Sequence, residues 1–289
     1  MTRTSTYTWS CASRSISIGT RTLIMGVLNV TPDSFSDGGA YANIDRAVQH
    51  ALDMHARGAD MIDIGGESSR PGAEPVSEAE ELNRTIPVIR ALRVKLDCPI
   101  SIDTTKSAVA KAAIQSGADI INDISACRLD PDMIPLTAET GAGVVLMHMQ
   151  GDPRSMQKNP QYTDVVHDII ALLQKHIDDL LALHIKPDQL IVDPGIGFGK
   201  SVADNYELLR RLHEFKTLDR PILVGPSRKS FIGKLLDLPP QERLEGTLAA
   251  AVAAIMNGAD ILRVHDVQAV QRAVRVTDAI TGKLLVDKL

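Results

Sequence analysis

Acidic, amide and basic side chains stand where short apolar runs of this sequence end, and together they could bind a flat nitrogen heterocycle. The set comprises Asp103, Asn122, Asp193 and Lys229. Carboxylates accept hydrogen bonds from ring N–H groups, while an amide or an ammonium group can contact ring acceptors. Such groups in one plane suit a heterocycle with an amino-pyrimidinone edge. Asp103 or Asp193 taken alone could equally cap a following helix, but the four residues together favour a binding site.

A second set of residues is cationic, which indicates an anionic ligand such as a phosphate. It consists of Arg70, Arg228, Lys229 and Arg263, with His265 nearby. Any one of these could be a solvated surface charge. Arg263 is the exception, because Ile261 and Leu262 place it at the end of a buried strand.

The segment from Asp193 to Lys200 carries alternating glycines at positions 195, 197 and 199. A glycine-rich loop can hold phosphate. The spacing here differs from that of the Walker motif, so the pattern gives a nucleotide site only weak support. The glycines could instead let the backbone pass close beneath a ligand, with Phe198 as a wall of the site.

The sequence shows no obvious nucleophile beside a base. Its eight histidines lack the spacing of zinc motifs, and His148, at the end of an apolar run, is predicted to be a structural hydrogen-bonding residue. Three loop hydroxyls are expected to contact a ligand rather than to act as nucleophiles. They belong to Ser34, Ser36 and Ser227.

The elements that must position these residues are eight short apolar runs, most of them followed by a loop and a helical pattern. The runs end near Asn29, Asp63, Asp103, Asn122, His148, Asp193, Gly225 and Arg263. Strands that alternate with helices form parallel sheets, and eight such units predict a closed barrel whose strand ends meet on one face. We therefore predict an α/β fold, a single (β/α)₈ TIM barrel with a short N-terminal extension.

A short repeat supports the barrel. Gly-Ala-Asp followed by two apolar residues and a polar one occurs at 58–63 and 117–122, and again with a basic last residue at 258–263. In each copy the glycine should end a helix in a left-handed conformation, and the last residue should emerge at the top of the barrel. These last residues are Asp63, Asn122 and Arg263.

Two segments are expected along the chain. Residues 1–21 form an N-terminal extension, with a possible hairpin at the barrel floor from residues 6–9 and 15–18, and residues 22–289 form the barrel domain. Asn43 is expected to cap the first barrel helix. Ser77 and Glu80 form a capping box for the next helix, in which Pro87 should produce a kink.

The composition is that of an ordinary globular protein, with 44% hydrophobic and 23% charged residues and a net charge of −5. The sequence has no basic field and few aromatic residues, which argues against nucleic-acid binding. Three cysteines without a C-x-x-C pair fit a reducing compartment. No apolar leader or run of about 18 apolar residues is present, so we expect a cytoplasmic protein with no membrane partner.

At the level of motifs, the chain resembles the dihydropteroate synthase family. The longest matching stretches are MGVLNVTPDSFSDGG at 25–39 and DIGGESSRPG at 63–72. The others lie at 101–104, 121–123, 147–151, 193–195, 227–230 and 263–266. They follow the expected order over about residues 21–280, and together they are highly specific.

The resemblance implies a pterin-binding TIM barrel and a transferase of folate biosynthesis. This family joins (7,8-dihydropterin-6-yl)methyl diphosphate to 4-aminobenzoate, and diphosphate is released. By analogy the pterin would contact Asp103, Asn122, Asp193 and Lys229. Asn29 would help to bind Mg²⁺, and Arg263 and His265 would bind the diphosphate. The aminobenzoate pocket, which sulfonamides can occupy, would involve Phe35, Ser69, Arg70, Pro71 and Ser230. The family also suggests a homodimer, with the late alanine-rich helices as a candidate contact.

The implied chemistry requires binding and charge stabilisation more than a strong base. Asp103, Lys229 and Arg263 would be the catalytic residues, since diphosphate is already a good leaving group. Its departure leaves a cation delocalised into the pterin, which Asp103 would stabilise. The arylamine then needs proximity to attack, and closed loops would keep water away from the cation.

Two positions depart from the usual family pattern. Many members have threonine where Ser69 stands, and Pro226 is unusual, so modest effects on sulfonamide binding are expected. Three alternatives remain open at this point. The chain could be a methyltransferase that acts on methyltetrahydrofolate, a non-catalytic pterin-binding paralogue, or a phosphate-binding barrel isomerase.

Overall fold

Eight parallel strands form one sheet that closes into a barrel. The computed structural model describes residues 6–31, 40–68, 73–151, 156 and 160–284. The strands are β3 (Leu23–Asn29), β4 (Met61–Gly65), β5 (Ile100–Asp103), β6 (Ile120–Asp123), β7 (Gly143–Met147), β8 (Leu190–Asp193), β9 (Leu223–Val224) and β10 (Ile261–Val264). Their order is β8-β7-β6-β5-β4-β3-β10-β9, and a parallel bridge between Val192 and Ile222 joins the two edges. The predicted (β/α)₈ barrel is therefore confirmed.

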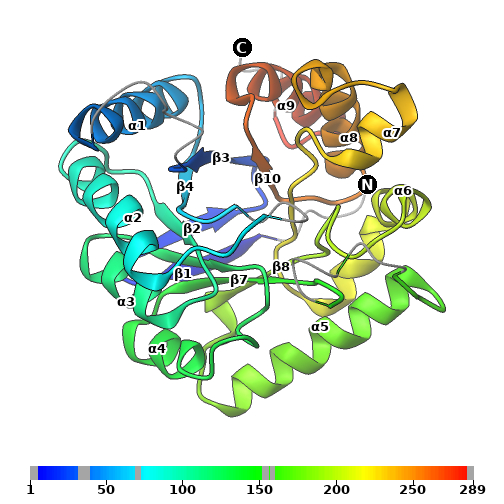
Figure 1. The fold of residues 1–289 in the computed structure, drawn as a ribbon. Helices are drawn as coiled ribbons and strands as arrows, with labels where there is room; N and C mark the ends of the chain where they lie inside the picture. The colour runs from blue at the N-terminus through cyan, green and yellow to red at the C-terminus, as the bar shows by residue number, and fades with distance from the viewer. Residues whose placement is uncertain (1–5, 32–39, 69–72, 152–155, 157–159, 285–289) are drawn as a thin grey trace.

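Helices surround the sheet on its outer face (Figure 1). In chain order they are α1 (Ala40–Ala56), α2 (Glu78–Arg93), α3 (Ser107–Gln115), α4 (Met133–Thr140), α5 (Val165–Ala182), α6 (Val202–Arg210), α7 (Ser230–Leu236), α8 (Leu244–Met256) and α9 (Val267–Thr281). None of the helices within the described ranges is long and apolar enough to cross a membrane.

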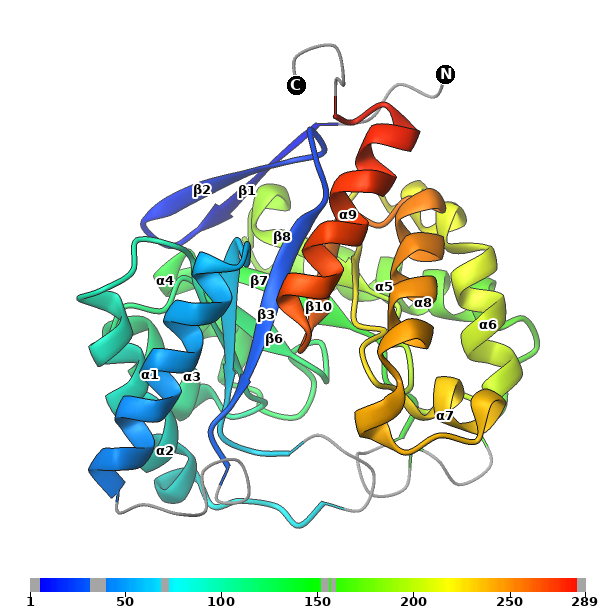
Figure 2. The ribbon, with the colours of Figure 1, turned by 90° about the horizontal axis from the view of Figure 1, so that it is seen from above.

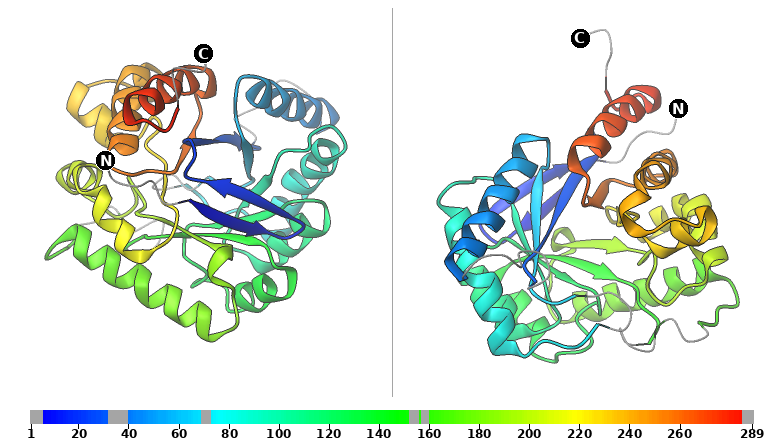
Figure 3. Two further views of the ribbon diagram at one scale, coloured as in Figure 1. Left: turned by 180° about the vertical axis from the view of Figure 1, so that it is seen from behind. Right: turned by 45° about the horizontal axis from the view of Figure 1, so that its top comes forward.

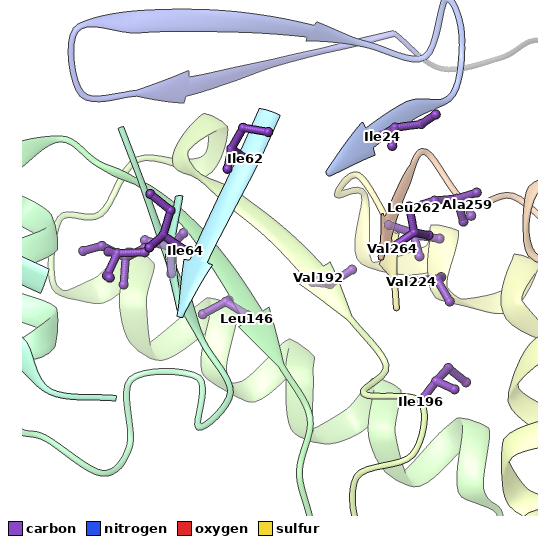
Figure 4. Close-up of a cluster of buried hydrophobic side chains, with 14 of the residues drawn as sticks. Ile24, Ile62, Ile64, Leu146, Val192, Ile196, Val224, Ala259, Leu262 and Val264 are labelled. Atoms are coloured by element: carbon purple, nitrogen blue, oxygen red, sulfur yellow. The ribbon is translucent and has the colours of Figure 1, made fainter. Parts of the chain in front are cut away.

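The strands bury both of their faces, which explains why they read as continuous apolar runs. Within β3, Leu23 and Met25 point into the barrel, while Ile24 and Leu28 pack against the helices. This alternation is the two-residue period of a strand. Figure 4 shows part of the outer layer, in which side chains of several neighbouring strands form one buried cluster.

A two-stranded hairpin covers the end of the barrel at which the strands begin (Figures 2 and 3). It consists of the antiparallel strands β1 (Tyr7–Cys11) and β2 (Arg14–Ile18). Trp9 packs with the first inward-facing residues of the barrel strands, and its indole N–H donates to the Gln189 carbonyl at 2.9 Å. A Cβ atom at Gly143 would lie 2.9 Å from Trp9 Nε1, so this close packing requires glycine at position 143.

The Gly-Ala-Asp repeat has the same structure in all three copies. The glycines at 58, 117 and 258 have φ of +104°, +108° and +105°. The aspartate two residues later accepts a hydrogen bond from a backbone N–H near the start of the adjoining strand. These bonds join Asp60 to Ile24 (2.8 Å), Asp119 to Ile100 (3.0 Å) and Asp260 to Ile222 (2.9 Å). The repeat thus ends a helix and fixes two neighbouring strands at the same time.

The helix starts are only partly as predicted. Ser77 caps α2 by accepting a hydrogen bond from the Glu80 backbone N–H at 3.3 Å, and α2 continues through Pro87. Asn43 does not cap α1, because α1 already begins at Ala40. A short polar side chain suits both a cap and an exposed first turn, so the pattern alone could not fix this boundary.

Candidate active site

The carboxyl ends of the barrel strands meet on the side opposite the hairpin (Figure 2). Charged and amide side chains from these strand ends form a hydrogen-bonded cluster. Arg263 donates through Nε to Asp63 Oδ2 and through Nη2 to Asp103 Oδ2, both at 2.6 Å. The Asn122 amide donates to the same Asp63 oxygen at 3.1 Å. These four residues are called the central cluster. The structure thus brings together three predicted site residues that lie up to 160 positions apart.

The central cluster shares one arginine between two buried carboxylates. Burial raises the pKa of Asp103 to about 7, although the positive charge of Arg263 acts in the opposite direction. Burial would lower the pKa of Arg263, but Asp63 and Asp103 outweigh this and raise it above its ordinary value. Arg263 therefore stays charged, while Asp103 takes up or loses a proton near neutral pH.

Asp63 was expected at the top of the barrel but not as a ligand-binding residue, and the structure places it in the site. Its side chain is fully buried at the centre of the cluster, and one of its oxygens accepts hydrogen bonds from both Asn122 and Arg263. The signal was present in the sequence, because the repeat places Asp63, Asn122 and Arg263 at equivalent positions. Asn122 and Arg263 were predicted to bind a ligand, and the equivalent position in the repeat indicates the same for Asp63.

A second group of predicted residues lies where β8 and the loop after β9 come together. Asp193 is buried, and its Oδ1 accepts a hydrogen bond from the Gly195 backbone N–H at 2.7 Å. Burial raises the pKa of Asp193 to about 6, against the effect of this hydrogen bond and of the Lys229 charge. The Lys229 ammonium lies 3.9 Å from the centre of the Phe198 ring, a cation–π contact.

Phe198 belongs to an apolar wall beside these polar groups. Its buried side chain clusters with Ile124, Met147, Met149 and Met156. Such a wall, next to the Lys229 ammonium, is suited to one face of a flat ring. The prediction that Phe198 forms a wall is consistent with this packing.

The alternating glycines of this loop are explained by contacts within the protein. Gly195, Gly197 and Gly199 have φ of +70°, +84° and +60°. A Cβ atom at Gly195 would lie 1.9 Å from the His148 carbonyl oxygen, and one at Gly197 would lie 2.9 Å from Lys229 Cδ. The glycines therefore let the loop pack closely against its neighbours.

Two members of the cationic set offer less free positive charge than the sequence suggested. Arg228, which was predicted to be one of the anion-binding cations, donates to both oxygens of Asp266 at 2.9 and 2.6 Å, so its charge is already paired. His265 Nδ1 lies 3.0 Å from the Ser227 hydroxyl. Burial and then the charge of Arg263 lower the pKa of His265 to about 3, so His265 is neutral at physiological pH.

Asn29, the predicted metal ligand, ends β3 beside the central cluster. A Cβ atom at Gly65 would come within 3.8 Å of Asn29 Oδ1 and 3.7 Å of Asp103 Oδ2. The two oxygens therefore flank the same small space, which glycine leaves clear. No group of three histidine, cysteine or acidic side chains suited to a metal occurs in the described part of the chain. A Mg²⁺ ion here would rely on Asn29, water and phosphate oxygens, a ligand set that Mg²⁺ accepts.

The predicted aminobenzoate pocket lies mostly outside the described residues. This holds for Phe35, Ser69, Arg70 and Pro71. Ser230 is described and is the exposed first residue of α7, directly after Lys229. A cavity of about 690 Å³ adjoins the site between α1 and α9, and Asn29, Arg228 and His265 are among the residues that line it.

Comparisons with known proteins agree with this geometry. Residues 25–265 match the family described as pterin binding enzyme. The dihydropteroate synthase of Synechocystis is 51% identical over 265 residues, which cover 91% of each chain. That of Escherichia coli is 49% identical over 256 residues, which cover 89% of this chain and 90% of the relative.

Solved structures give the same result. The Yersinia pestis dihydropteroate synthase, determined with a sulfonamide drug complex, has 47% identity and a TM-score of 0.90 and covers 95% of this chain and 99% of its own. The Xanthomonas albilineans enzyme with 4-aminobenzoic acid has 43% identity and a TM-score of 0.89 and covers 96% and 99%. By sequence and by fold, the chain belongs to the pterin-binding enzymes and, among them, to the dihydropteroate synthase family.

Proposed function

We propose that this protein joins (7,8-dihydropterin-6-yl)methyl diphosphate to 4-aminobenzoate, giving 7,8-dihydropteroate and diphosphate. The observation that carries the proposal is the central cluster. Two buried carboxylates share one arginine there, and an amide donates to one of the two carboxylates, at the end of the barrel where enzymes of this fold have their active sites. A neutral heterocycle that presents N–H donors can satisfy these acceptors, and an anionic tail can satisfy the cations.

The pterin would lie with its amino-pyrimidinone edge toward Asp193 and Asn122. Carboxylate and amide oxygens can accept from the ring N–H groups, and Lys229 can donate to a ring acceptor. Phe198 supports the proposed pose, because its ring is buried at the side of the site and Lys229 lies against it. The ring would thus be held by polar groups at its edge and by an apolar wall at its face.

The diphosphate would lie toward Asn29, Arg263 and His265. Arg263 supplies a permanent charge, and the neutral His265 ring supplies an N–H donor. Mg²⁺, when bound with Asn29, would neutralise charge on the diphosphate oxygens. The cavity beside Asn29 and His265 offers a path by which the released diphosphate could leave.

The reaction would proceed by loss of diphosphate from the methylene carbon. The C–O bond breaks with both electrons on the diphosphate, and the resulting cation is delocalised into the pterin ring. An ionised Asp103 would stabilise this cation, while Arg263 stabilises the charge on the leaving group. The arylamine nitrogen then forms the new C–N bond and loses a proton. No strong base is required, because the amine needs mainly to be held close to the carbon.

The second substrate would bind beside Ser230, with Phe35, Ser69, Arg70 and Pro71. The 4-aminobenzoic acid in the Xanthomonas albilineans relative and the sulfonamide in the Yersinia pestis relative support this part of the proposal. A sulfonamide would compete for the same pocket. The three buried thiols of Cys11, Cys98 and Cys127 fit a reducing location, so we place the reaction in the cytoplasm, which cell fractionation would check.

Purified protein with Mg²⁺ and both substrates should form dihydropteroate, and omission of either substrate or of Mg²⁺ should abolish product.

Lys229→Ala should raise the KM for the pterin diphosphate about 10- to 100-fold, because a hydrogen bond to a charged group contributes about 1.5–3 kcal/mol. The matched control is Lys234→Ala, since Lys234 lies exposed on the short helix α7, which begins directly after Lys229. Product formed from one substrate alone would rule out the condensation, and equal KM values for the two variants would rule out the role of Lys229.

We also propose that the protein is a homodimer that associates through α6, α7 and α8. An apolar groove of about 530 Å³ lies between these helices, and Leu235 beside it is 65% exposed. Leu235→Glu should convert the dimer to a monomer in sedimentation experiments, because it places a charge in an apolar contact. Leu129→Glu, at a 56% exposed leucine elsewhere, should leave the mass unchanged. A wild-type protein that sediments as a monomer would contradict the proposal.

A further inference from the structure

Lys200 is a buried lysine that the proposed reaction does not use. Only 3% of its surface is exposed, although it ends the glycine-rich loop that begins after Asp193. Among the described residues, no carboxylate forms an ion pair with its ammonium group. Burying a charge without such a partner is costly, so its contacts should have a purpose beyond filling space.

Three acceptors surround the Lys200 ammonium. The Phe198 carbonyl oxygen lies at 2.8 Å, His148 Nδ1 at 2.9 Å and the His148 carbonyl oxygen at 3.3 Å. Two of these acceptors follow strand β7, and the third belongs to the loop after β8. The ammonium thus occupies a small cation site built from two carbonyl groups and an imidazole, and it ties one strand end to the next loop.

The His148 ring is suited to accept this hydrogen bond. Burial, together with the nearby Lys200 charge, lowers the pKa of His148 to about 2, so the ring is neutral. Tyr162 covers the same region, with its ring centre 6.0 Å from that of His148 and its hydroxyl donating to the Gly199 carbonyl at 2.6 Å. Burial also lowers the pKa of Lys200 to about 7, while Asp193 favours the charged form.

The contacts of Lys200 connect it, through Phe198, to Lys229 in the proposed pterin-binding part of the site. The carbonyl group that Lys200 holds belongs to Phe198, whose ring lies against the Lys229 ammonium. The same loop makes a turn in which the Phe198 N–H donates to the Gly195 carbonyl at 3.0 Å. A shift of the Phe198 backbone would therefore move both the apolar wall and the side chain of Lys229.

We propose that Lys200 is a positioning residue whose buried ε-amino group, through its hydrogen bonds, fixes Phe198 and through it Lys229 in the geometry that binds the pterin. The inference rests on the proposed pterin-binding roles of Phe198 and Lys229. Lys200 itself would touch neither substrate. Its loss should therefore weaken pterin binding and leave the 4-aminobenzoate side of the reaction largely intact.

The test compares Lys200→Ala with Lys200→Met, which keeps an unbranched apolar stem of four atoms but lacks the ammonium. Both variants should raise the KM for the pterin diphosphate about 10-fold or more, because each loses charged hydrogen bonds. The KM for 4-aminobenzoate, measured at saturating pterin diphosphate, should change less than about 2-fold. Lys234→Ala serves as the control for loss of an exposed lysine.

Chemical rescue separates positioning from a general loss of structure. Ethylammonium chloride should lower the raised KM of Lys200→Ala, because the two carbonyls and the imidazole still surround a vacant space. It should not affect Lys200→Met, whose side chain occupies the space that the ethyl group would need, and sodium chloride at equal ionic strength should rescue neither. An unchanged KM in both variants, or a raised KM in Lys200→Ala that ethylammonium leaves as it was, would overturn the inference.

The proposed function and this inference fail in different ways. If Lys229→Ala leaves the KM for the pterin diphosphate unchanged, the pterin-binding role of Lys229 is wrong. If Lys229→Ala raises this KM and the Lys200 variants do not, only the inference about Lys200 is wrong. Should Lys200→Ala fail to fold, the KM values of Lys200→Met decide the question, because that variant preserves the packing of the stem.

Discussion

Asp63→Ala is expected to lower the free energy of unfolding by about 3 kcal/mol, because removing one partner of a buried ion pair leaves the other charge poorly compensated. Asp63 is fully buried, and one of its oxygens accepts from both Arg263 and Asn122. In the variant Arg263 would keep only Asp103 as a partner, and the Asn122 amide would lose its acceptor. Both side chains would then no longer be held in one geometry.

The same substitution should reduce kcat/KM at least about 100-fold, a loss of roughly 2.7 kcal/mol of transition-state stabilisation. Thermal unfolding should show a midpoint lowered by roughly 6 °C or more, and steady-state kinetics should show the loss of activity. Asp179→Ala, at an exposed position of α5, should change neither quantity. A variant with the stability and activity of the parent would show that Asp63 does not organise the central cluster.

Asp103→Asn is expected to reduce kcat about 100- to 1000-fold and to change the pH dependence of the reaction. The substitution keeps the shape of the side chain but removes the negative charge that would stabilise the pterin cation. A preorganised charge of this kind contributes about 2.7–4 kcal/mol. Arg263 would also lose a charged partner at 2.6 Å.

The direction of the pH effect follows from the pKa of Asp103, which burial raises to about 7. The carboxylate form is required, so kcat/KM of the parent should fall as the pH drops below about 7. In Asp103→Asn this limb should disappear, and the remaining decline should begin near pH 6, where Asp193 takes up a proton. Asp179→Ala should keep the parent profile. A limb near pH 7 that persists in Asp103→Asn would assign it to another group.

The raised pKa of Asp103 also has a consequence for stability. The folded protein keeps this proton up to about pH 7, whereas an unfolded chain releases it near pH 4. Between these values the folded state binds more protons, so the ionisation of Asp103 lowers stability as the pH rises from about 4 to about 7. The group thus lowers stability where it is most active, as expected for a residue kept for function.

The sequence predicted the barrel and most of the central cluster for a definite physical reason. Parallel strands that are buried on both faces leave short continuous apolar runs, and the polar residue at the end of each run is visible against them. Asn122 and Arg263 were found in this way. Sequence patterns over a few neighbouring positions were enough to predict these strand ends, because each strand, its preceding glycine and its last residue lie within a few positions of one another.

The pairings between distant residues could not be predicted, since they depend on which loops lie side by side. Arg228 was expected to bind an anion, but Asp266, 38 positions away, already pairs its charge. Lys200 was not predicted to have a role, although it contacts His148, 52 positions earlier. Charge and spacing identify such residues as polar and say nothing of their partners.

In the Gly-Ala-Asp repeat, the residues that hold the barrel strands together differ from the residue that reaches the active site. The glycine and aspartate of each copy make the contacts that hold the strands, while the last residue is an acid, an amide or a base in turn. Exchange of that last residue leaves those anchoring contacts in place. Descendants of such a barrel can therefore acquire new substrates through substitutions at a few interchangeable positions, without rebuilding the scaffold that carries them.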